Sequence, residues 1–471
     1  MNDPFGRRAV GLSIAAAVGG FLFGFDSSVI NAAVDSIESQ FALNAVVTGF
    51  VVAVALLGCA VGAVIAGVLS DRLGRLLVMR IGAVLFLASS IGAALAVGVG
   101  DLIFWRVLGG LGIGIASVVA PAYIAEVAPS RIRGALGSLQ QLAITLGIFA
   151  ALLSDAILAE AAGSASGTLW FGLEAWRWMF LVGVVPAAVY GVLSFTIPES
   201  PRFLIAKGRT DAARAIFAKL MPAAELESTM VEVGAAIAAD HQNAKASLRG
   251  RTFGLQPIVW IGVILSVLQQ FVGINVIFYY STTLWKSVGF DESASLTISV
   301  VTSIINVAVT LVAISLVDRV GRRPILLTGS VMMAVSLGTM ALAFVFATGT
   351  GADVTLPGAW GPIALVAANL FVIGFGVSWG PLVWVLLGEI FPSRIRGRAL
   401  GVAAGAQWIA NFAITVSFPV MSSWSLPITY AMYAVFAVLS FVFVFTKIPE
   451  TKGAALEETE AIFAAHSARR G

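Results

Sequence analysis

The chain has 471 residues, of which 59% are hydrophobic and only 11% are charged. An ordinary soluble domain carries about 25% charged residues, so this composition excludes a single soluble core. The formal net charge is +3 and no run of Lys or Arg suggests nucleic-acid binding. The one cysteine, Cys59, excludes an internal disulfide, and His241 and His466 have no Cys or His at ligand spacing. We therefore expect no metal site and no cofactor.

Apolar stretches of about 20 residues recur along the chain, and a helix of that length crosses a hydrocarbon layer roughly 30 Å thick. The first stretch follows Arg7 and Arg8 and ends without a small-residue cleavage site, so we interpret it as a retained span. Six spans are predicted near 9–33, 45–69, 77–98, 102–125, 135–159 and 177–197. Six more are predicted near 255–285, 294–316, 324–348, 358–387, 398–421 and 427–446.

Lys and Arg gather on one side of the predicted membrane. With the N-terminus inside, we place only Arg177 and Lys286 of the 28 Lys and Arg outside and only Arg106 well within a span, since Arg80 and Arg398 lie near inner span ends. This bias follows the positive-inside rule and supports an even number of spans with both termini cytoplasmic. The predicted fold is an all-α membrane protein with 12 transmembrane helices in two six-helix halves.

The polar middle of the chain separates these halves and has an apolar rhythm that suits short amphipathic helices on the inner surface. The predicted parts are an N-terminal half at 1–198, a cytoplasmic linker at 199–254, a C-terminal half at 255–447 and a cytoplasmic tail at 448–471.

Two motifs occur once in each half. The sequence Asp-Arg-Leu-Gly-Arg at 71–75 returns as Asp-Arg-Val-Gly-Arg at 318–322, and the segment 126–134 returns in similar form at 389–397. Each copy follows an even-numbered span of its own half. A parallel duplication of six spans predicts this placement.

These motifs resemble those of the sugar porter family of the major facilitator superfamily, and in particular its bacterial proton-coupled xylose and glucose symporters. Further marks in the same order are Arg106 with Gly109 and Gly110, Pro-Glu-Ser-Pro-Arg at 198–202, the segment 269–275 and Pro-Glu-Thr at 449–451. The resemblance runs nearly end to end. It implies secondary active transport of a monosaccharide, a hexose or pentose such as glucose or xylose, by alternating access across a bacterial cytoplasmic membrane.

Amide side chains on the seventh span are candidates for sugar binding. Gln269, Gln270 and Asn275 surround Gly273, which is expected to break the helix. Amides donate and accept hydrogen bonds, as sugar hydroxyls do, although hydrogen bonding between helices explains the same residues equally well. The resemblance implies sugar contact for these three. It implies the same for Gln141, Trp384, Gln407, Asn306, Phe23, Trp408 and Asn411.

The position of a residue on its helix distinguishes sugar contact from a structural role. Trp384 lies in the middle of a span and is expected to cover the apolar face of a pyranose, whereas tryptophans nearer the span ends suit interfacial anchoring. Gln140 points away from Gln141 on a helix and is expected to be structural.

The repeated charged motifs lie at inner helix ends, where ordinary surface charge is the simplest explanation. The resemblance implies instead that their carboxylates and guanidiniums pair across the two halves and close the inner side in one conformation, because such contacts are strong and yet break when water enters. The gating residues implied are Asp71, Arg72, Arg75, Glu126, Arg133, Glu199, Arg202, Asp318, Arg319, Arg322, Glu389, Arg396 and Glu450.

Asp26 interrupts the first span, and Arg106 lies early in the fourth. A carboxylate at a helix centre costs about 2.5 to 3.5 kcal/mol on insertion scales, so Asp26 needs a partner or a proton. The resemblance implies that these two residues face each other and couple sugar to proton movement. A static ion pair is the alternative.

Other functions stay open or are disfavoured. The glycines at 110, 112 and 114 lie within a span and lack the strand and acidic partner of a nucleotide-binding loop, so close helix packing explains them better. The sequence contains no Walker motif, so ATP-driven transport by this chain is not expected. An enzyme is not expected, because the clear mid-span charges reduce to Asp26 and Arg106. The alternatives are an uncoupled facilitator and a membrane sugar sensor, although the short C-terminal tail disfavours a sensor.

Overall fold

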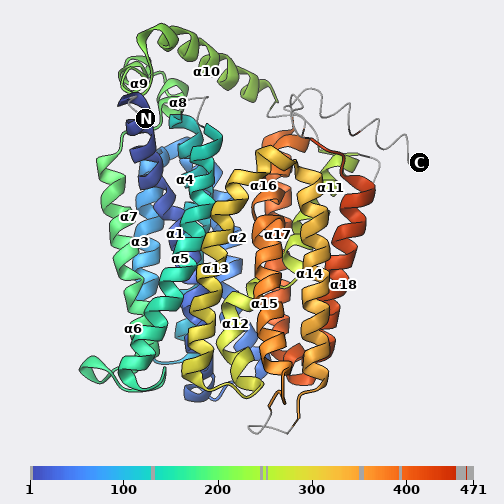
Figure 1. Ribbon diagram of the computed structural model, residues 1–471. Coiled ribbons are helices and arrows are strands. Elements are labelled where there is room, and N and C mark those ends of the chain that lie inside the picture. The colour runs from blue at the N-terminus through green and yellow to red at the C-terminus, as the bar shows by residue number, and fades with distance from the viewer. Residues whose placement is uncertain are drawn as a thin grey trace. The chain divides into compact units, whose positions relative to one another are not determined.

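The computed structural model describes residues 4–128, 133–243, 248–250, 253–348, 355–391, 395–451 and 463. Within these residues, 12 helical spans are long and apolar enough to cross a membrane (Figure 1). Their ends fall within a few residues of the predicted ends, except that the first span continues to Gln40. The prediction of a twelve-span helical membrane protein is therefore confirmed.

The first six spans are formed by seven helices. They are α1 (Pro4–Gln40), α2 (Ala45–Leu73), α3 (Arg75–Ala94), α4 (Val99–Val127), α5 (Arg133–Ala162), and α6 (Ala175–Val182) continued by α7 (Val184–Thr196). Three short helices then follow: α8 (Pro201–Ala206), α9 (Thr210–Phe217) and α10 (Ala223–Asn243). In Figure 1 these three lie beyond the ends of α3 and α4. The expected helical linker is therefore present.

The last six spans are formed by eight helices. They are α11 (Pro257–Phe271) continued by α12 (Ile274–Ser287), α13 (Glu292–Val320), α14 (Arg322–Val345), α15 (Trp360–Val377) continued by α16 (Trp379–Ile390), α17 (Arg396–Trp424) and α18 (Leu426–Lys447). Two of these spans are discontinuous.

Gly273 breaks the seventh span, as predicted. Its φ of +83° lies in the left-handed region, and a Cβ there would stand 2.7 Å from the ring of Tyr433. Only glycine combines that backbone with such a close ring. The tenth span lies at Trp360–Ile390, close to the predicted 358–387, and Ser378 (φ −118°, ψ −86°) separates its two helices, α15 and α16. The Gly380-Pro381 pair fits the start of α16, since proline is tolerated in a first helical turn.

The helices group into two compact units. The first unit comprises residues 1–27, 54–151 and 177–246, and the second comprises 28–53, 152–176 and 247–471. In the first unit α3 packs against α4 and α7, and in the second α14 packs against α15 and α18. Each of α1, α2 and α5 contributes to both units. The predicted boundaries at 1–198, 199–254, 255–447 and 448–471 follow chain order and stay a prediction.

Glycines allow close backbone contact inside the first unit. A Cβ at Gly110 would overlap the carbonyl oxygen of Ala55, and one at Gly114 would overlap that of Cys59. A Cβ at Gly24 would overlap the carbonyl oxygen of Ile144 in the same way. Small residues let membrane helices approach closely, so the prediction that the glycine series serves packing is confirmed.

Candidate functional site

Four amide side chains form a connected cluster in the second unit, and we call Gln269, Gln270, Asn275 and Gln407 the amide cluster. Gln269 Nε2 donates to the carbonyl oxygen of Trp379 at 2.8 Å, and Gln407 Nε2 donates to Gln269 Oε1 at 2.6 Å. Gln270 Nε2 donates to the same Gln269 oxygen at 3.3 Å, and Asn275 Nδ2 donates to Gln270 Oε1 at 2.6 Å. The break at Gly273 places Asn275 beside Gln270 although five residues separate them.

The amide cluster contacts the break between α15 and α16 and contains one side-chain oxygen that could accept a hydrogen bond from a polar ligand. Gln269 also donates to the carbonyl oxygen of Gly380 at 3.2 Å, in the first turn of α16. A carbonyl oxygen has two lone pairs, so it can accept this bond in addition to one within its own helix. Gln407 Oε1 accepts no hydrogen bond from the part of the chain that the structure describes. An unused acceptor next to amide donors can bind a hydroxyl group.

Trp384 and Asn411 follow the cluster along their helices. Trp384 lies four residues after Gly380 on α16, on the same helix face, and 45% of its surface is exposed. Asn411 lies four residues after Gln407 on α17, is buried, and accepts a hydrogen bond from Thr415 Oγ1 at 3.1 Å. Trp384 is thus one helical turn from a carbonyl group that Gln269 contacts, and its stacking on a sugar stays a prediction.

The other predicted sugar contacts are dispersed. Asn306 is buried on α13, where a Cβ at Gly376 would lie 3.5 Å from its Oδ1. Trp408 is half-buried on α17, and Gln141 and Phe23 are half-buried on the parts of α5 and α1 that belong to the first unit. The structure therefore joins Gln269, Gln270, Asn275 and Gln407, and leaves the remaining assignments as predictions.

Gln140 lies beside a glycine of α1. A Cβ at Gly20 would stand 2.8 Å from the Gln140 side chain, so this glutamine packs tightly against α1. That contact supports a structural role for Gln140.

Asp26 and Arg106 face each other in the first unit, as predicted. Arg106 Nη1 lies 3.4 Å from both carboxylate oxygens of Asp26, and the two residues are 8% and 3% exposed, Asp26 being the more exposed. The Arg106 guanidinium also lies 5.9 Å from the centre of the Phe180 ring. A single nitrogen at this distance makes a weak contact for a buried pair, which needs excellent geometry to offset desolvation.

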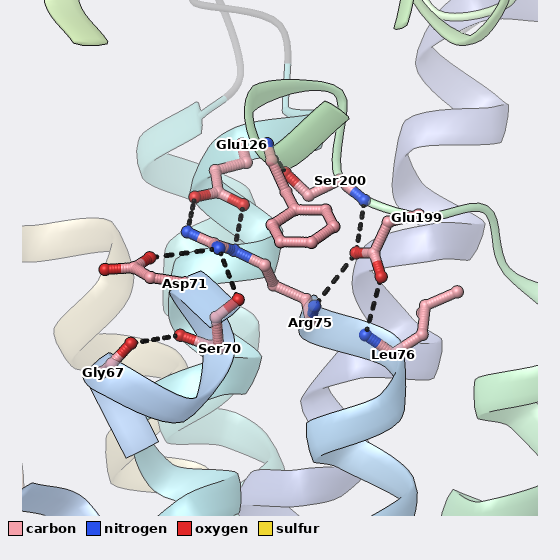
Figure 2. Close-up of polar contacts among 9 residues, drawn as sticks. Gly67, Ser70, Asp71, Arg75, Leu76, Glu126, Glu199 and Ser200 are labelled. Atoms are coloured by element: carbon pink, nitrogen blue, oxygen red, sulfur yellow. Dashed lines mark hydrogen bonds and ion pairs between the residues drawn. The ribbon is translucent and has the colours of Figure 1, made fainter. Parts of the chain in front are cut away.

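Arg75 organises a charged network at one end of the first unit (Figure 2). Its guanidinium forks onto both Glu126 oxygens, with Nε and Nη2 at 3.0 and 2.9 Å, and Nη1 contacts Asp71 at 3.2 Å. The backbone N–H groups of Arg75 and Leu76 donate to Glu199 at 3.0 and 3.3 Å. A bidentate guanidinium–carboxylate contact is strong and directional. The network thus fastens the start of α3 to the end of α4 and to the segment before α8.

The second unit contains the duplicate of this network. Arg322 Nε and Nη2 both donate to Glu389 Oε1, at 3.2 and 2.9 Å, and Thr451 Oγ1 donates to Glu389 Oε2 at 2.7 Å. The N–H groups of Arg322 and Arg323 each donate to Glu450 at 3.0 Å. Glu450 therefore occupies the place that Glu199 has in the first unit.

Positive-φ glycines let both carboxylates approach the helix starts. Gly74 has a φ of +92° and Gly321 a φ of +108°. A Cβ at Gly74 would overlap a Glu199 oxygen, and one at Gly321 would stand 2.8 Å from a Glu450 oxygen. The Gly of each Asp-Arg-x-Gly-Arg motif is thereby explained: the carboxylate must reach unpaired N–H groups at a helix N-terminus.

The contacts just described do not test the expectation that these motifs pair across the two halves, and that expectation stays a prediction. Arg75 pairs with Glu126 inside the first half of the chain, and Arg322 pairs with Glu389 inside the second. Each arginine begins the helix that follows its motif, so a carboxylate of its own half is within reach. The side chains of Arg133, Asp318 and Arg396 lie outside the described residues. Arg72 and Arg319 are exposed and Arg202 is half-buried.

Two features were missed. Asp155 is a third buried charged residue within a predicted span, besides Asp26 and Arg106, and its type and position in the span 135–159 were visible in the sequence. A polar set also joins α1 to α12 in the second unit. Asn31 Nδ2 donates to the Phe278 carbonyl oxygen at 2.8 Å, and Lys286 Nζ lies 2.7 Å from Asp35. The sequence marked Lys286 as one of two cations on the outer side, but it did not indicate that Asp35 is its partner.

Comparison with known proteins agrees with this architecture. The family model described as "Sugar (and other) transporter" matches residues 12–463. The glucose transport protein of Synechocystis sp. is 53% identical over 449 residues, which cover 95% of this chain and 96% of that protein. The D-xylose-proton symporter of Escherichia coli is 37% identical over 498 residues, covering 98% and 97%.

A solved structure extends the likeness to three dimensions. The proton:xylose symporter XylE bound to 6-bromo-6-deoxy-D-glucose matches with a TM-score of 0.81 at 35% identity, covering 97% of this chain and 100% of that chain. The expected major facilitator fold is therefore confirmed.

Proposed function

The chain belongs to the sugar transporter family, and we propose that it is a proton-coupled symporter of a monosaccharide in the cytoplasmic membrane. The amide cluster is the observation that carries the sugar assignment, since it is a neutral hydrogen-bonding surface formed at two helix breaks. We assign no enzymatic activity to the chain. Its partners are a hexose or pentose such as glucose or xylose, a proton and the lipid bilayer.

The amide cluster supports recognition of several hydroxyl groups at once. Gln269 Oε1 already accepts from Gln407 and Gln270, at 2.6 and 3.3 Å. A bound sugar would exchange some of these amide–amide bonds for amide–hydroxyl bonds. Such an exchange contributes about 0.5 to 1.5 kcal/mol per bond, so several bonds are needed for useful affinity. The proposed set is completed by Gln141, Trp384, Asn306, Phe23, Trp408 and Asn411.

The Asp26–Arg106 pair supports proton coupling. Asp26 lies next to the point, between Ser27 and Ser28, where α1 passes from the first unit to the second. We propose that α1 bends at this point during the switch and so changes the separation of the pair. Protonation neutralises Asp26 and releases the guanidinium, so the proton and the position of α1 become linked. A nearby positive charge favours an ionised carboxylate, whereas burial favours the protonated form. A change in the distance to the guanidinium can therefore bind or release a proton.

The repeated charged networks support alternating access. We propose that the halves 1–198 and 255–447 each move largely as one piece, and that the thirteen gating residues named above govern the switch. The Arg75 and Arg322 networks keep helices of their own half together while the contacts between halves change. Rocking of one repeat against the other about a central site is the usual mechanism of duplicated transporters.

Vesicle transport tests the proposal. Labelled glucose and xylose should accumulate in vesicles that carry a proton gradient, and a protonophore should abolish the accumulation. The variant Asp26→Asn should still exchange sugar across the membrane without accumulating it. If no transported sugar causes proton uptake into wild-type vesicles, the pair is static and the protein is a facilitator. Sugar binding without exchange would instead identify a sensor.

A further inference from the structure

Asp155 is a buried acid that the proposed sugar and proton sites do not use. It lies in α5 within the membrane span, has 0% of its surface exposed, and belongs to the second unit. Neither carboxylate oxygen forms a hydrogen bond with any residue that the structure describes. A polar side chain is retained within a membrane span at a cost, so a carboxyl there is a candidate for function.

The charged groups at this end of the second unit are engaged elsewhere. Lys286 lies 2.7 Å from Asp35 and 3.7 Å from Glu292. Glu292 also accepts the N–H of Ala165 at 2.7 Å, and Glu38 accepts from Thr48 at 3.1 Å. Glu160, one turn beyond Asp155 on α5, is exposed. Of the described ionisable groups on α1, α5, α12 and α13 here, none is an ion-pair partner of Asp155.

A small cavity approaches Asp155 from the predicted outer side. Ala156, Ala159 and Glu160 of α5 form one wall, and Glu292, Leu296 and Thr297 of α13 form the other. Ala159 is four residues after Asp155, so it lies one helical turn further out on the same face. The acid is therefore one turn below a cavity whose rim carries two carboxylates.

The two walls come from different halves of the chain, because α5 precedes the linker and α13 follows it. This inference rests on alternating access in the proposed function: opening of the outer side separates α5 from α13 and lets water reach Asp155. In water an aspartic acid, with an ordinary pKa of about 3.9, is ionised at neutral pH. A carboxyl that is buried without a partner is far more stable in its neutral, protonated form than as a carboxylate.

We propose that Asp155 is a second proton-binding carboxyl, which holds its proton while α5 and α13 are together and releases it to the outer side when they separate. No covalent step besides O–H ionisation is involved: the proton passes to water and the carboxylate keeps the electron pair. Raising the external pH then favours the open outer side. One such group changes an opening equilibrium by at most about tenfold per pH unit.

Cysteine labelling measures this opening directly. The natural cysteine, Cys59, is buried, so Cys59→Ala with Ala159→Cys leaves one thiol on the cavity wall. Right-side-out vesicles, without sugar or a proton gradient, are treated with a membrane-impermeant maleimide between pH 5.5 and 7.5. The same measurement is made in the Asp155→Asn variant, which lacks the titrating group but keeps the shape of the side chain. The thiol reaction itself depends on pH equally in both proteins, so only the difference between them reports on Asp155.

Between pH 5.5 and 7.5, the labelling rate should increase in the protein with Asp155 and increase less in the Asp155→Asn variant. The factor of increase with Asp155 should be more than about five times the factor in the variant. Asp155→Glu should restore the steep dependence, and Glu160→Gln should leave it unchanged. Equal pH dependence with and without Asp155 overturns the proposal. Because the assay involves neither sugar nor proton flux, a steep Asp155-dependent result would stand even if wild-type vesicles showed no sugar-driven proton uptake. Absence of labelling at every pH would refute outer opening as well.

Discussion

Two arginine–carboxylate contacts of the first unit contain the same groups and differ in geometry. Arg75 forks onto both oxygens of Glu126 at 2.9 and 3.0 Å, whereas Arg106 reaches Asp26 with one nitrogen at 3.4 Å. Further donors and acceptors surround Arg75, including the Ser70 carbonyl oxygen at 3.0 Å. The first geometry suits a contact that stays closed. The second suits a pair whose carboxylate exchanges its partner for a proton.

The largest expected effect comes from removing Glu126. The variant Glu126→Ala leaves a guanidinium that is only 10% exposed without its main partner, and breaking a buried pair in this way costs about 3 to 5 kcal/mol. Thermal unfolding in detergent should show a large loss of stability. Asp26→Asn should lose less, because asparagine keeps the shape of the side chain and one oxygen that can accept a hydrogen bond from Arg106. Equal losses in the two variants would remove the distinction between them.

An exposed ion pair provides the control for that experiment. Arg214 and Glu227 pair on the linker helices with side chains 49% and 66% exposed. Exposed pairs contribute about 0 to 1 kcal/mol, so Glu227→Ala should unfold close to the wild-type temperature. A loss as large as that of Glu126→Ala would show that charge removal alone, not burial, causes the effect.

The next largest expected effect is on sugar affinity, which should depend on the neutral amide cluster. Gln269→Ala removes the residue that contacts Gln270, Gln407 and two backbone carbonyls. Each hydrogen bond to the sugar that is lost costs about 0.5 to 1.5 kcal/mol, which raises the sugar Kd about 2- to 13-fold per bond in equilibrium binding. Gln140→Ala is the matched control and should bind sugar normally. Wild-type affinity in Gln269→Ala would reject the cluster as the sugar site.

The duplicate network allows a finer comparison with Glu126. The Glu389 side chain is 22% exposed, and both Nε and Nη2 of Arg322 donate to the same oxygen, Oε1. Water therefore compensates part of the loss, and we expect Glu389→Ala to destabilise the protein by about 1 to 3 kcal/mol, less than Glu126→Ala. The two variants are compared by unfolding in the same detergent. A greater loss at Glu389 would reverse the ranking by burial.

The smallest effect tests the hydroxyl that is particular to the second network. Thr451→Val keeps the shape of the side chain and removes its 2.7 Å bond to Glu389 Oε2. A hydrogen bond to a charged group contributes about 1.5 kcal/mol or slightly more. Unfolding should shift modestly, and in the background Glu389→Ala the same change should have almost no effect. Additive losses would mean that Thr451 acts through other contacts.

The sequence alone determined the number, order and approximate ends of the spans, because the length and hydropathy of a membrane helix are local properties. It also determined the break at Gly273 and the duplication, since both are visible as residue types at fixed places. The Asp26–Arg106 pair was found through the resemblance together with the high cost of isolated charges in a span. The amide cluster was anticipated in part, while Arg133, Asp318 and Arg396 remain predictions.

Only the tertiary structure decided which groups meet. Arg75 reaches Glu126 over 51 residues and Glu199 over 124 residues, and neither choice follows from spacing along one helix. Ser378, where the tenth span breaks, packs against Gly329 of α14, and the burial of Asp155 depends on the helices around α5. Hydropathy is a sum over neighbours in the chain, whereas a hydrogen bond depends on how helices far apart in the chain pack. The sequence could therefore place the charged groups in the spans, but it could not assign their partners.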